Sequence, residues 1–412
     1  MKTKIICTLG PASSNAESID KLIRAGVKVF RVNFSHGSVE ENAGKLKLIK
    51  KLGGSTMADL PGPKLRVENF QGVLETGKTV LSSRLSIPKL KKGERVFLSD
   101  GLIELQVLND RECVVLRGGE VRSGMGINIP SLNRLKSPTE KDLRIAKRIG
   151  GFSDFLALSY TQSRDSIREL RKVYAGNIVA KIETRNGVEN LSEIISEADL
   201  VMIARGDLGV QLPFEQTPLI QKKIIAACEE QSKTAIVATQ MLESMTKESF
   251  PTRAEVTDVA NAVLDGADAL LLSEETAIGV NPENAVKTMR TIIQATQSSI
   301  KERTFKSSNI SQSIGESSKN ISESIKARAI LTKTRSGKTA LTISRYKSQT
   351  PIIALTSSEK TFNKLLLAWN VTPVKVKSME VLPLKDLFSK GDVVVLTYGS
   401  SLDTDSIKVI KV

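Results

Sequence analysis

Histidine is nearly absent from this chain, which has a single one, His36, among its 412 residues. A metal centre built from several histidines is therefore excluded, and a Ser-His-Asp triad could use only this residue. Acid and base chemistry must depend on lysines, carboxylates, hydroxyl groups or water. An isolated histidine is most often structural, so we assign His36 no chemical step.

Cysteines and long apolar runs are also scarce. The three cysteines, Cys7, Cys113 and Cys228, are unclustered and odd in number. They predict neither a disulfide framework nor a zinc site, and they favour a reducing, cytoplasmic location. No apolar stretch approaches the ~20 residues that span a bilayer. The run from Ile5 to Leu9 is short and closed by Gly10-Pro11, so we interpret it as a strand and not as a signal peptide.

Aromatic residues make up only 4% of the chain, whereas its formal charge is +15. A strongly basic protein can bind nucleic acid, but here the lysines are scattered and few aromatics accompany them. We favour a solvated, lysine-rich surface whose positive field attracts anionic substrates, and we predict no nucleic-acid partner. The 40% of hydrophobic and 25% of charged residues are typical of a globular protein, and the length predicts two or three domains.

The main pattern that is present is a repeated alternation of strand-like and helix-like segments. Eight short apolar runs precede residue 275, and segments such as Ser13 to Ala25 between them carry apolar residues at helical spacing. This order predicts a closed (β/α)₈ barrel, whose chemistry lies on the loops that follow the strands. The eight runs are Thr3 to Leu9, Val27 to Phe34, Ser55 to Leu60, Phe152 to Leu158, Ile178 to Ile182, Leu200 to Ala204, Thr234 to Ala238, and Asp268 to Leu272.

Two carboxylates and a lysine follow neighbouring strands of this predicted barrel. Lys181 and Glu183 end the fifth run, and Asp207 follows the sixth. Since parallel strands share one carboxyl end, we expect the three side chains to lie close together. Carboxylate oxygens suit Mg²⁺, and a lysine beside them suits a phosphate group. Lys181 and Glu183 alone would be an ordinary rim salt bridge, but Asp207 on the next strand favours a metal site.

Two further regions interrupt the alternation. About ninety residues separate the third and fourth runs, far more than a loop needs. Alternating segments such as Arg95 to Leu98, with turns at Asp100-Gly101 and Gly118-Gly119, predict a small inserted β domain there, which could act as a lid. We place the barrel at 1–60 and 130–300, the lid at 61–129, a linker with a helix at 301–326, and a shortened C-terminal α/β domain at 327–412.

Motif strings along almost the whole chain, in the family's own order, resemble those of the pyruvate kinases. The resemblance implies the same three-domain layout and the transfer of a phosphoryl group from phosphoenolpyruvate to ADP, giving pyruvate and ATP. The strings are Lys4 to Pro11, Arg31 to Gly37, Asp59 to Arg66, Asp100 to Ile103, Thr139 to Asp142, Ala180 to Glu183, Ala204 to Gly209, Ala238 to Met245, Pro251 to Glu255, and Asp258 to Asp268.

The resemblance also implies a role for each matching residue. Phosphoryl transfer depends mainly on positioning and charge stabilisation, which explains the residue types. Arg31 would grip the phosphate and Lys181 would neutralise the moving group, while Thr239 would help to deliver a proton to the enolate, through water. By the same resemblance the substrate contacts are Arg31, Lys181, Ala204, Arg205, Gly206, Asp207 and Thr239; the Mg²⁺ or Mn²⁺ ligands are Glu183 and Asp207; and the nucleotide contacts are Asn33, His36 and Arg66.

Four substitutions distinguish this chain from the pattern of the family. Many pyruvate kinases hold potassium at positions matching Asn33, Ser35, Asp59 and the Leu60 carbonyl, with a glutamate where this chain has Lys64. The Lys64 ammonium could supply the ion's charge, so we predict activity without potassium. Pro61 and Met125 replace lysines common in the family, which would weaken contacts to ADP phosphates, and Glu274 replaces a usual glycine.

The resemblance further implies a homotetramer and a candidate effector loop. In many relatives the loop matching Thr332, Thr334, Arg335, Ser336, Gly337 and Thr339 binds a phosphorylated effector; a solvated basic turn is an equal alternative. Because the C-terminal domain is short, we predict hyperbolic or weakly regulated kinetics. Two rival functions stay open at this point. One is a Mg²⁺-dependent barrel aldolase or mutase acting on pyruvate or phosphoenolpyruvate, and the other is a nucleic-acid-binding protein on a retired enzyme scaffold.

Overall fold

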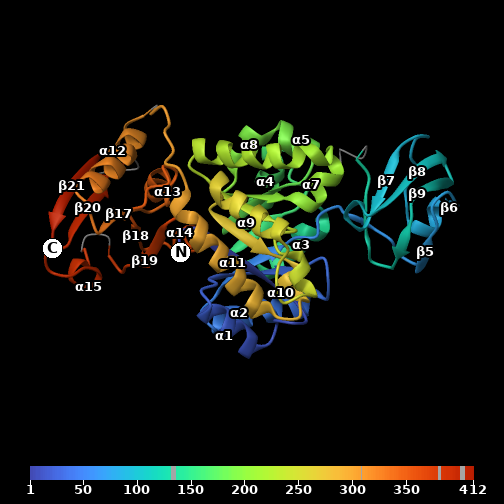
Figure 1. Ribbon diagram of the computed structural model, residues 1–412, viewed down its shortest axis with the longest axis horizontal. Helices are drawn as coiled ribbons and strands as arrows, with labels where there is room; N and C mark the ends of the chain where they lie inside the picture. The colour runs from blue at the N-terminus through green and yellow to red at the C-terminus, as the bar shows by residue number, and fades with distance from the viewer. Residues whose placement is uncertain (131–135, 308, 379–381, 400–403) are drawn as a thin grey trace.

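The computed structural model describes residues 1–130, 136–307, 309–378, 382–399 and 404–412. Residue 308 of the predicted linker and parts of the predicted barrel and C-terminal domain, 131–135, 379–381 and 400–403, lie outside these ranges. No helix within the described ranges has the length and apolar character needed to cross a membrane. Figure 1 shows three bodies in a row: the inserted domain, a central barrel, and the C-terminal domain.

The central body is the predicted closed barrel of eight parallel strands. Strand β1 pairs with both β2 and β16, which closes the cylinder. The fold prediction from the alternating pattern is therefore confirmed. The strands are β1 (Lys4–Leu9), β2 (Val29–Asn33), β3 (Ser55–Asp59), β12 (Phe155–Leu158), β13 (Asn177–Ile182), β14 (Leu200–Ala204), β15 (Thr234–Ala238) and β16 (Ala269–Leu272).

The barrel helices surround the strands, and side-chain caps define where several of them begin. In α2 and α9 the cap residues, Ser38 and Thr252, exchange hydrogen bonds with a glutamate three positions later, and Gly266 ends α9 at a φ of 105°. The helices are α1 (Ala16–Arg24), α2 (Val39–Lys51), α3 (Glu140–Ile149), α4 (Arg164–Arg171), α5 (Arg185–Glu189), α6 (Leu191–Glu197), α7 (Arg205–Gln211), α8 (Thr217–Glu230), α9 (Arg253–Asp265), α10 (Glu274–Ala277) and α11 (Pro282–Thr296).

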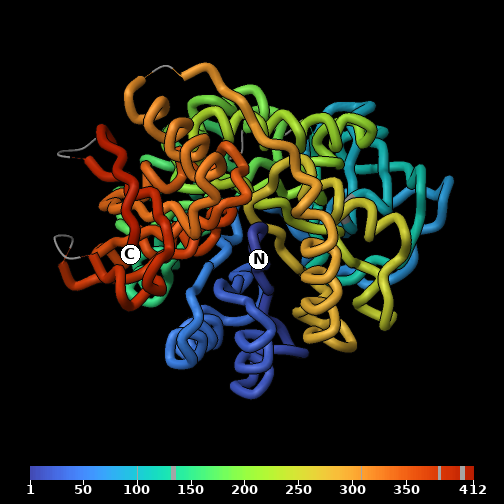
Figure 2. The backbone as a smooth tube through the Cα atoms, turned by 60° about the vertical axis from the view of Figure 1, so that its left-hand side comes forward, coloured from blue at the N-terminus to red at the C-terminus, as the bar shows by residue number. Residues whose placement is uncertain are grey.

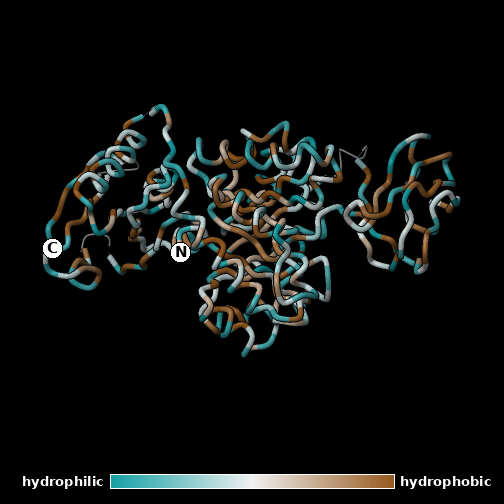
Figure 3. The backbone as a smooth tube through the Cα atoms, viewed as in Figure 1, coloured by the Kyte–Doolittle hydropathy of each residue, from teal (hydrophilic) through white to brown (hydrophobic). Residues whose placement is uncertain are grey.

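Apolar side chains fill both the inside of the barrel and the layer between strands and helices, and the barrel segments are correspondingly brown in Figure 3. The interior cluster includes Ile6, Met57, Phe155 and Met202, all fully or almost fully buried. It also includes Leu367, which comes from the C-terminal domain. The barrel is thus a packed core, and one of its ends is closed by another domain.

The inserted domain consists of short antiparallel strands. Six pair in the order β4-β11-β7-β8-β9-β6, and β10 pairs with β5. Their inward side chains, such as Val96, Leu105 and Val115, form a separate small core. The strands are β4 (Leu65–Arg66), β5 (Gly72–Leu74), β6 (Thr79–Leu81), β7 (Arg95–Leu98), β8 (Ile103–Asn109), β9 (Glu112–Arg117), β10 (Gly119–Val121) and β11 (Gly126–Asn128). We call this domain the lid.

The C-terminal domain is a five-stranded sheet in the order β19-β18-β17-β20-β21, parallel except for the last pair. In Figure 2 it packs beside the barrel, close to the N-terminus. It touches the amino ends of the barrel strands: Ser55 bonds Asn363 at 2.8 Å, and Lys4 bonds the Val371 carbonyl at 3.0 Å. Its elements are α12 (Ile310–Ser324), β17 (Ala329–Lys333), α13 (Lys338–Ser344), β18 (Ile352–Thr356), α14 (Glu359–Leu365), β19 (Val371–Lys375), α15 (Leu384–Leu387), β20 (Val393–Tyr398) and β21 (Ser406–Lys411).

Candidate active site

Lys181 lies at the centre of the predicted site, near the carboxyl end of β13. Its ammonium is 2.8 Å from the Ser159 hydroxyl, 3.2 Å from Asp59 Oδ1 and 3.4 Å from Glu183 Oε2. Burial alone would lower the pKa of Lys181, but the charges of Asp59 and Glu183 outweigh it and hold the pKa above its usual value. Lys181 is therefore a fixed cation at neutral pH.

Glu183 follows β13 and is completely buried. Its Oε1 accepts a 2.6 Å hydrogen bond from the Tyr160 amide, whereas its Oε2 has no hydrogen-bond partner. Burial, together with the nearby charges of Asp207 and Asp59, raises the pKa of Glu183 despite Lys181 beside it. A buried carboxylate oxygen that accepts no hydrogen bond is energetically costly even beside the Lys181 ammonium at 3.4 Å, and a bound cation would reduce that cost.

Asp59, at the end of β3, joins Lys181 to Arg31. The Arg31 guanidinium donates to Asp59 Oδ2 through Nε at 2.8 Å and also to the Thr8 hydroxyl at 3.0 Å. Burial would raise the pKa of Asp59, but Lys181 and Arg31 lower it overall. Arg31, Asp59 and Lys181 therefore form a chain of fixed charges across the strands β2, β3 and β13.

Asp207 lies in the first turn of α7, directly after β14. Its Oδ1 is 2.6 Å from the ammonium of Lys64, and both side chains are 18% exposed. The sequence placed Asp207 beside Glu183, and the influence of Asp207 on the Glu183 pKa agrees with that placement. The sequence did not predict Lys64 at Asp207, because that contact joins the lid to the barrel over 143 positions.

Thr239 follows β15 and faces the start of α7. Its hydroxyl accepts a 2.9 Å hydrogen bond from the Gly206 amide and donates to the Ala238 carbonyl at 2.6 Å. Thr239 and the next residue, Gln240, both have positive φ values, 73° and 53°, which is unusual for residues other than glycine. Ala204, the last residue of β14, lies directly before Arg205, the first residue of α7.

The Arg205 guanidinium holds this strained turn. It donates to the carbonyl of Thr239 at 2.7 Å and to that of Gln240 at 2.9 Å. On its other side it forms an ion pair with Asp258 of α9 at 2.7 Å. The side chain of the predicted substrate residue Arg205 is therefore tied to the scaffold in this structure.

The predicted nucleotide residues lie at the mouth of the barrel. The His36 side chain is exposed, and partial burial together with Arg66, Arg31 and Lys64 lowers its pKa. Arg66 donates to the Gly124 carbonyl of the lid at 2.7 Å. Asn33 Oδ1 accepts from the Ser35 amide at 3.0 Å. Three cations close enough to affect His36 create a positive region suited to polyphosphate.

Comparison with protein families decides between the candidate functions. The model of the pyruvate kinase barrel domain matches residues 1–286, and that of the pyruvate kinase alpha/beta domain matches residues 312–410. The chain belongs to the pyruvate kinase family. Pyruvate kinase of Thermotoga maritima is 38% identical over 463 aligned positions, covering 100% of this chain and 99% of the relative. Pyruvate kinase of Staphylococcus aureus strain USA300 is 36% identical over 453, covering 97% and 77%.

The donor set fits the divalent metal that pyruvate kinases generally need. No group of three or more His, Cys, Asp or Glu side chains in the described ranges is arranged to hold a metal by itself. Mg²⁺ does not require such a cage, because it commonly binds through one or two carboxylates, substrate phosphates and water. The Oε2 atom of buried Glu183, which accepts no hydrogen bond, and the carboxylate of Asp207 are suited to this arrangement.

Three of the residues that differ from the pattern of the family, Met125, Glu274 and Pro61, have different surroundings. Met125, which replaces a lysine common in the family, is partly buried and packs against the small core of the lid. Glu274 is exposed at the start of α10. Pro61 is half-buried in the segment between β3 and the lid. Next to it, Gly62 has a φ of 66°, and a Cβ there would lie 2.8 Å from the Cβ of Ser159, so this position needs glycine.

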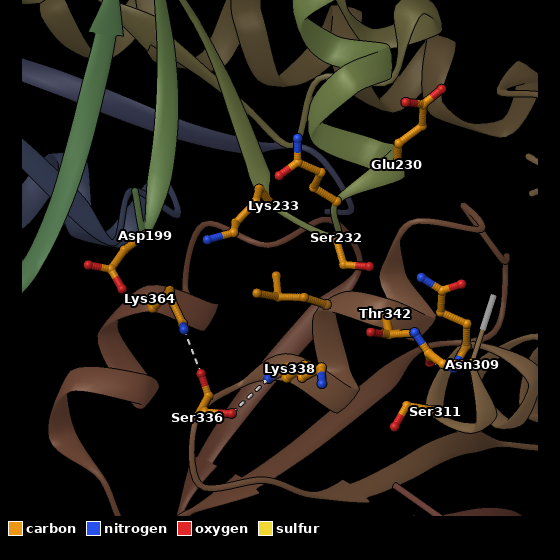
Figure 4. Close-up of a pocket in the computed structure, with 13 residues that line it drawn as sticks. Asp199, Glu230, Ser232, Lys233, Asn309, Ser311, Ser336, Lys338, Thr342 and Lys364 are labelled. Carbon is orange, nitrogen blue, oxygen red and sulfur yellow. Dashed lines mark hydrogen bonds between the residues drawn. The ribbon is translucent and has the colours of Figure 1, made fainter. Parts of the chain in front are cut away.

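The candidate effector loop runs from the end of β17 into the start of α13. Thr332 is buried, and Thr334 Oγ1 accepts from the Gly337 amide at 2.9 Å. The Arg335 and Ser336 carbonyls accept from Thr361 and Lys364 of α14, and the Thr339 hydroxyl contacts that of Thr404. Ser336 lines a cavity of about 330 Å³ between the barrel and the C-terminal domain. Figure 4 shows Lys233, Lys338 and Lys364 around this cavity, at the amino ends of the barrel strands.

Several residues of the site were not singled out from the sequence. Ser159 bonds Lys181, Tyr160 donates its amide to Glu183, and Thr8 bonds Arg31. Asp258, from α9, was missed as the partner of Arg205. Thr8, Ser159 and Tyr160 lie in or directly after a barrel strand, so a systematic search of strand ends for polar groups would have found them.

Proposed function

We infer that this chain is a phosphotransferase that moves the phosphoryl group of phosphoenolpyruvate to ADP, forming pyruvate and ATP. Its membership of the pyruvate kinase family over both matched domains supports this reaction. The observation in the structure that best supports this reaction is the group of Lys181, Glu183 and Asp207 at the carboxyl ends of the adjoining strands β13 and β14. Nothing in the fold or the relatives favours the barrel aldolase or mutase.

Charge placement explains how these residues would act. The Lys181 ammonium would neutralise the moving phosphoryl group, and the Arg31 guanidinium would hold its oxygens. Glu183 and Asp207 would hold the divalent cation, Mg²⁺ or Mn²⁺, which when bound supplies positive charge to the substrate oxygens. The backbone from Ala204 to Gly206 would orient the substrate carboxylate. Pre-set charges of this kind stabilise a transition state without reorganising during the reaction.

Thr239 is the hydroxyl group best placed to direct the final protonation. Its Oγ1 lies against the Gly206 amide at 2.9 Å, on the turn after β15. We propose that it holds the water that gives a proton to the enolate carbon. Asn33, His36 and Arg66 would contact ADP, with the lid folding over it.

The experiment that tests this function measures pyruvate released from phosphoenolpyruvate, ADP and Mg²⁺. Lys181→Met should lower kcat by at least on the order of 10²- to 10³-fold, because it removes a buried charge that the transition state needs. The matched control is Lys172→Met, since Lys172 is an exposed lysine on α4 that pairs only at the surface with Glu169. Wild-type protein without this activity, or full activity in Lys181→Met, would contradict the proposal.

We also propose that the enzyme works without potassium. The Lys64 ammonium, which helps to lower the pKa of His36, would supply the positive charge that many relatives take from potassium at positions matching Asn33, Ser35, Asp59 and Leu60. Turnover in potassium-free buffer should therefore be within about twofold of turnover with the ion, a change of less than ~0.5 kcal/mol in the barrier. Lys64→Glu should make turnover depend on potassium. A wild-type rate that falls by orders of magnitude without potassium would refute this.

The oligomeric state, the effector control and the cellular location of the protein remain proposals. A homotetramer would cover exposed apolar side chains of the barrel, including Phe214, Leu219 and Phe250, and light scattering would measure the mass. Effector control through the loop from Thr332 to Thr339 is expected to be weak, so rate curves should stay near hyperbolic when a sugar bisphosphate is added. A cytoplasmic location agrees with three buried, unpaired cysteines. We retain the domain boundaries proposed from the sequence.

A further inference from the structure

Lys64 connects the lid to the proposed metal site. It lies five positions beyond the end of β3 and directly before β4, the first strand of the lid. Its ammonium is 2.6 Å from Asp207 Oδ1, and both side chains are largely buried. The same carboxylate that is expected to bind the divalent cation therefore already holds a cation.

The backbone of the lid makes room for this contact. Gly126, on the returning strand β11, pairs with Arg66 of β4. A Cβ on Gly126 would lie only 2.5 Å from Cε of Lys64. The atom that would be crowded is near the flexible end of a side chain, so an alanine there would displace Lys64 and leave the strands in place. Glycine at 126 thus permits the Lys64 side chain to reach Asp207.

Electrostatics explain why a cation belongs at Asp207. Asp59 and Glu183 approach the same Lys181 ammonium at 3.2 and 3.4 Å, and Asp207 follows the strand next to that of Glu183. Negative charges gathered in this way repel one another. The Lys64 ammonium offsets one of these negative charges. A divalent cation bound to Glu183 and Asp207 would offset two of them, but Mg²⁺ takes oxygen ligands at about 2.1 Å and would compete with the Lys64 ammonium for the Asp207 carboxylate.

We propose that Lys64 is an internal counter-cation that occupies Asp207 in the metal-free protein, and that a divalent cation must displace it to bind. This inference depends on the proposed metal site at Glu183 and Asp207. Displacement has two consequences. The free protein binds the metal more weakly than the two carboxylates alone would, and metal binding releases the tie between the start of the lid and α7. Binding of the metal is thereby coupled to the mobility of the lid relative to the barrel.

The test is a titration of the full-length protein with Mn²⁺ alone, with free Mn²⁺ measured by electron paramagnetic resonance. Lys64→Met should bind Mn²⁺ about tenfold more tightly than wild type, because a partly buried competing charge is removed. Gly126→Ala, which keeps every charge but crowds Lys64, should bind about threefold more tightly. Asp207→Asn should lose the site, and thermal melting curves check that each variant is folded.

Each result decides the question. Tighter binding in both Lys64→Met and Gly126→Ala supports displacement. Tighter binding in Lys64→Met with no change in Gly126→Ala would overturn it, because the lysine would then act only through its distant field. Unchanged affinity in both variants, or Mn²⁺ binding that Asp207→Asn does not reduce, would also overturn it. Phosphotransfer by the wild-type protein is measured separately, so failure of the inference is distinct from failure of the proposed function.

Hydrogen exchange gives an independent measurement of the contact between Lys64, at the start of the lid, and Asp207 of α7. Without metal, amides of β4 and β11 should exchange more slowly in wild type than in Lys64→Met. Saturating Mn²⁺ should remove this difference, since the metal frees Lys64 in the wild-type protein. Equal exchange in the two metal-free proteins would refute the proposed coupling of metal occupancy to the lid.

Discussion

At the scale of single residues, the site is a set of buried charges that hold one another in place. Arg31, Asp59 and Lys181 are linked by contacts of 2.6 to 3.2 Å, and the lowered pKa of Asp59 and the raised pKa of Lys181 keep these two side chains ionised. A buried charge without such partners would be neutralised instead. Uncharged neighbours also hold these charged side chains in position, and the clearest case is Ser159, which bonds Lys181.

Ser159→Ala should lower kcat by about tenfold. The hydroxyl accepts from Lys181 at 2.8 Å and donates to the Leu60 carbonyl at 2.7 Å, and loss of one positioning hydrogen bond is worth about 1–1.5 kcal/mol in the barrier. Steady-state measurement of pyruvate release gives kcat. The control is Ser196→Ala, which removes an exposed hydroxyl that bonds the Glu193 carbonyl. Equal kcat in both variants would show that Ser159 does not position Lys181.

At the scale of elements, the loops after the strands are kept in unusual shapes by neighbouring elements. The turn after β15 contains two residues with positive φ, and Arg205 of α7 holds both of their carbonyls while Asp258 of α9 holds Arg205. Strained backbone persists only where its surroundings stabilise it. The place of Thr239 in the site thus depends on α7, which follows the neighbouring strand β14, and on α9, which lies further along the chain after β15.

Arg205→Lys should reduce kcat by roughly tenfold and leave Tm within a few degrees. Lysine keeps the charge but cannot bond both carbonyls and Asp258 at once, because it lacks the planar guanidinium. Arg253→Lys, at the exposed start of α9, is the matched control. An Arg205→Lys enzyme with wild-type kcat would mean that the turn keeps its shape without the guanidinium.

At the scale of the whole molecule, the barrel separates two different interfaces. The lid and the charged site lie at the carboxyl ends of the strands, and the C-terminal domain packs on the amino ends, where Leu367 completes the barrel interior. Polar contacts cross the second interface as well. Lys4 of β1 donates to the Val371 carbonyl of β19 at 3.0 Å. Burial lowers the pKa of Lys4 to about 8, with Asp268 opposing the shift.

Stability should therefore depend on pH through Lys4. The folded pKa lies below the unfolded value, so between about pH 8 and 10.5 the unfolded chain holds more protons, and stability rises with pH in that window. Compared with Lys4→Met, the wild-type protein should gain on the order of 1–2 kcal/mol between pH 7 and 10. Thermal unfolding of both proteins at the two pH values measures the change in their Tm difference. A Tm difference that does not change with pH would exclude a shifted pKa.

The sequence by itself determined the barrel, because local runs and their helical connections carry their own periodicity. It also brought Lys181, Glu183 and Asp207 together, since parallel strands of a closed barrel share one carboxyl end. Only the tertiary structure decided which groups each charge meets. The contacts of Lys64 with Asp207, Ser159 with Lys181, and Arg205 with the Thr239 turn join residues 143, 22 and 34 positions apart. Such contacts follow from packing between elements, and no local pattern in the chain records them.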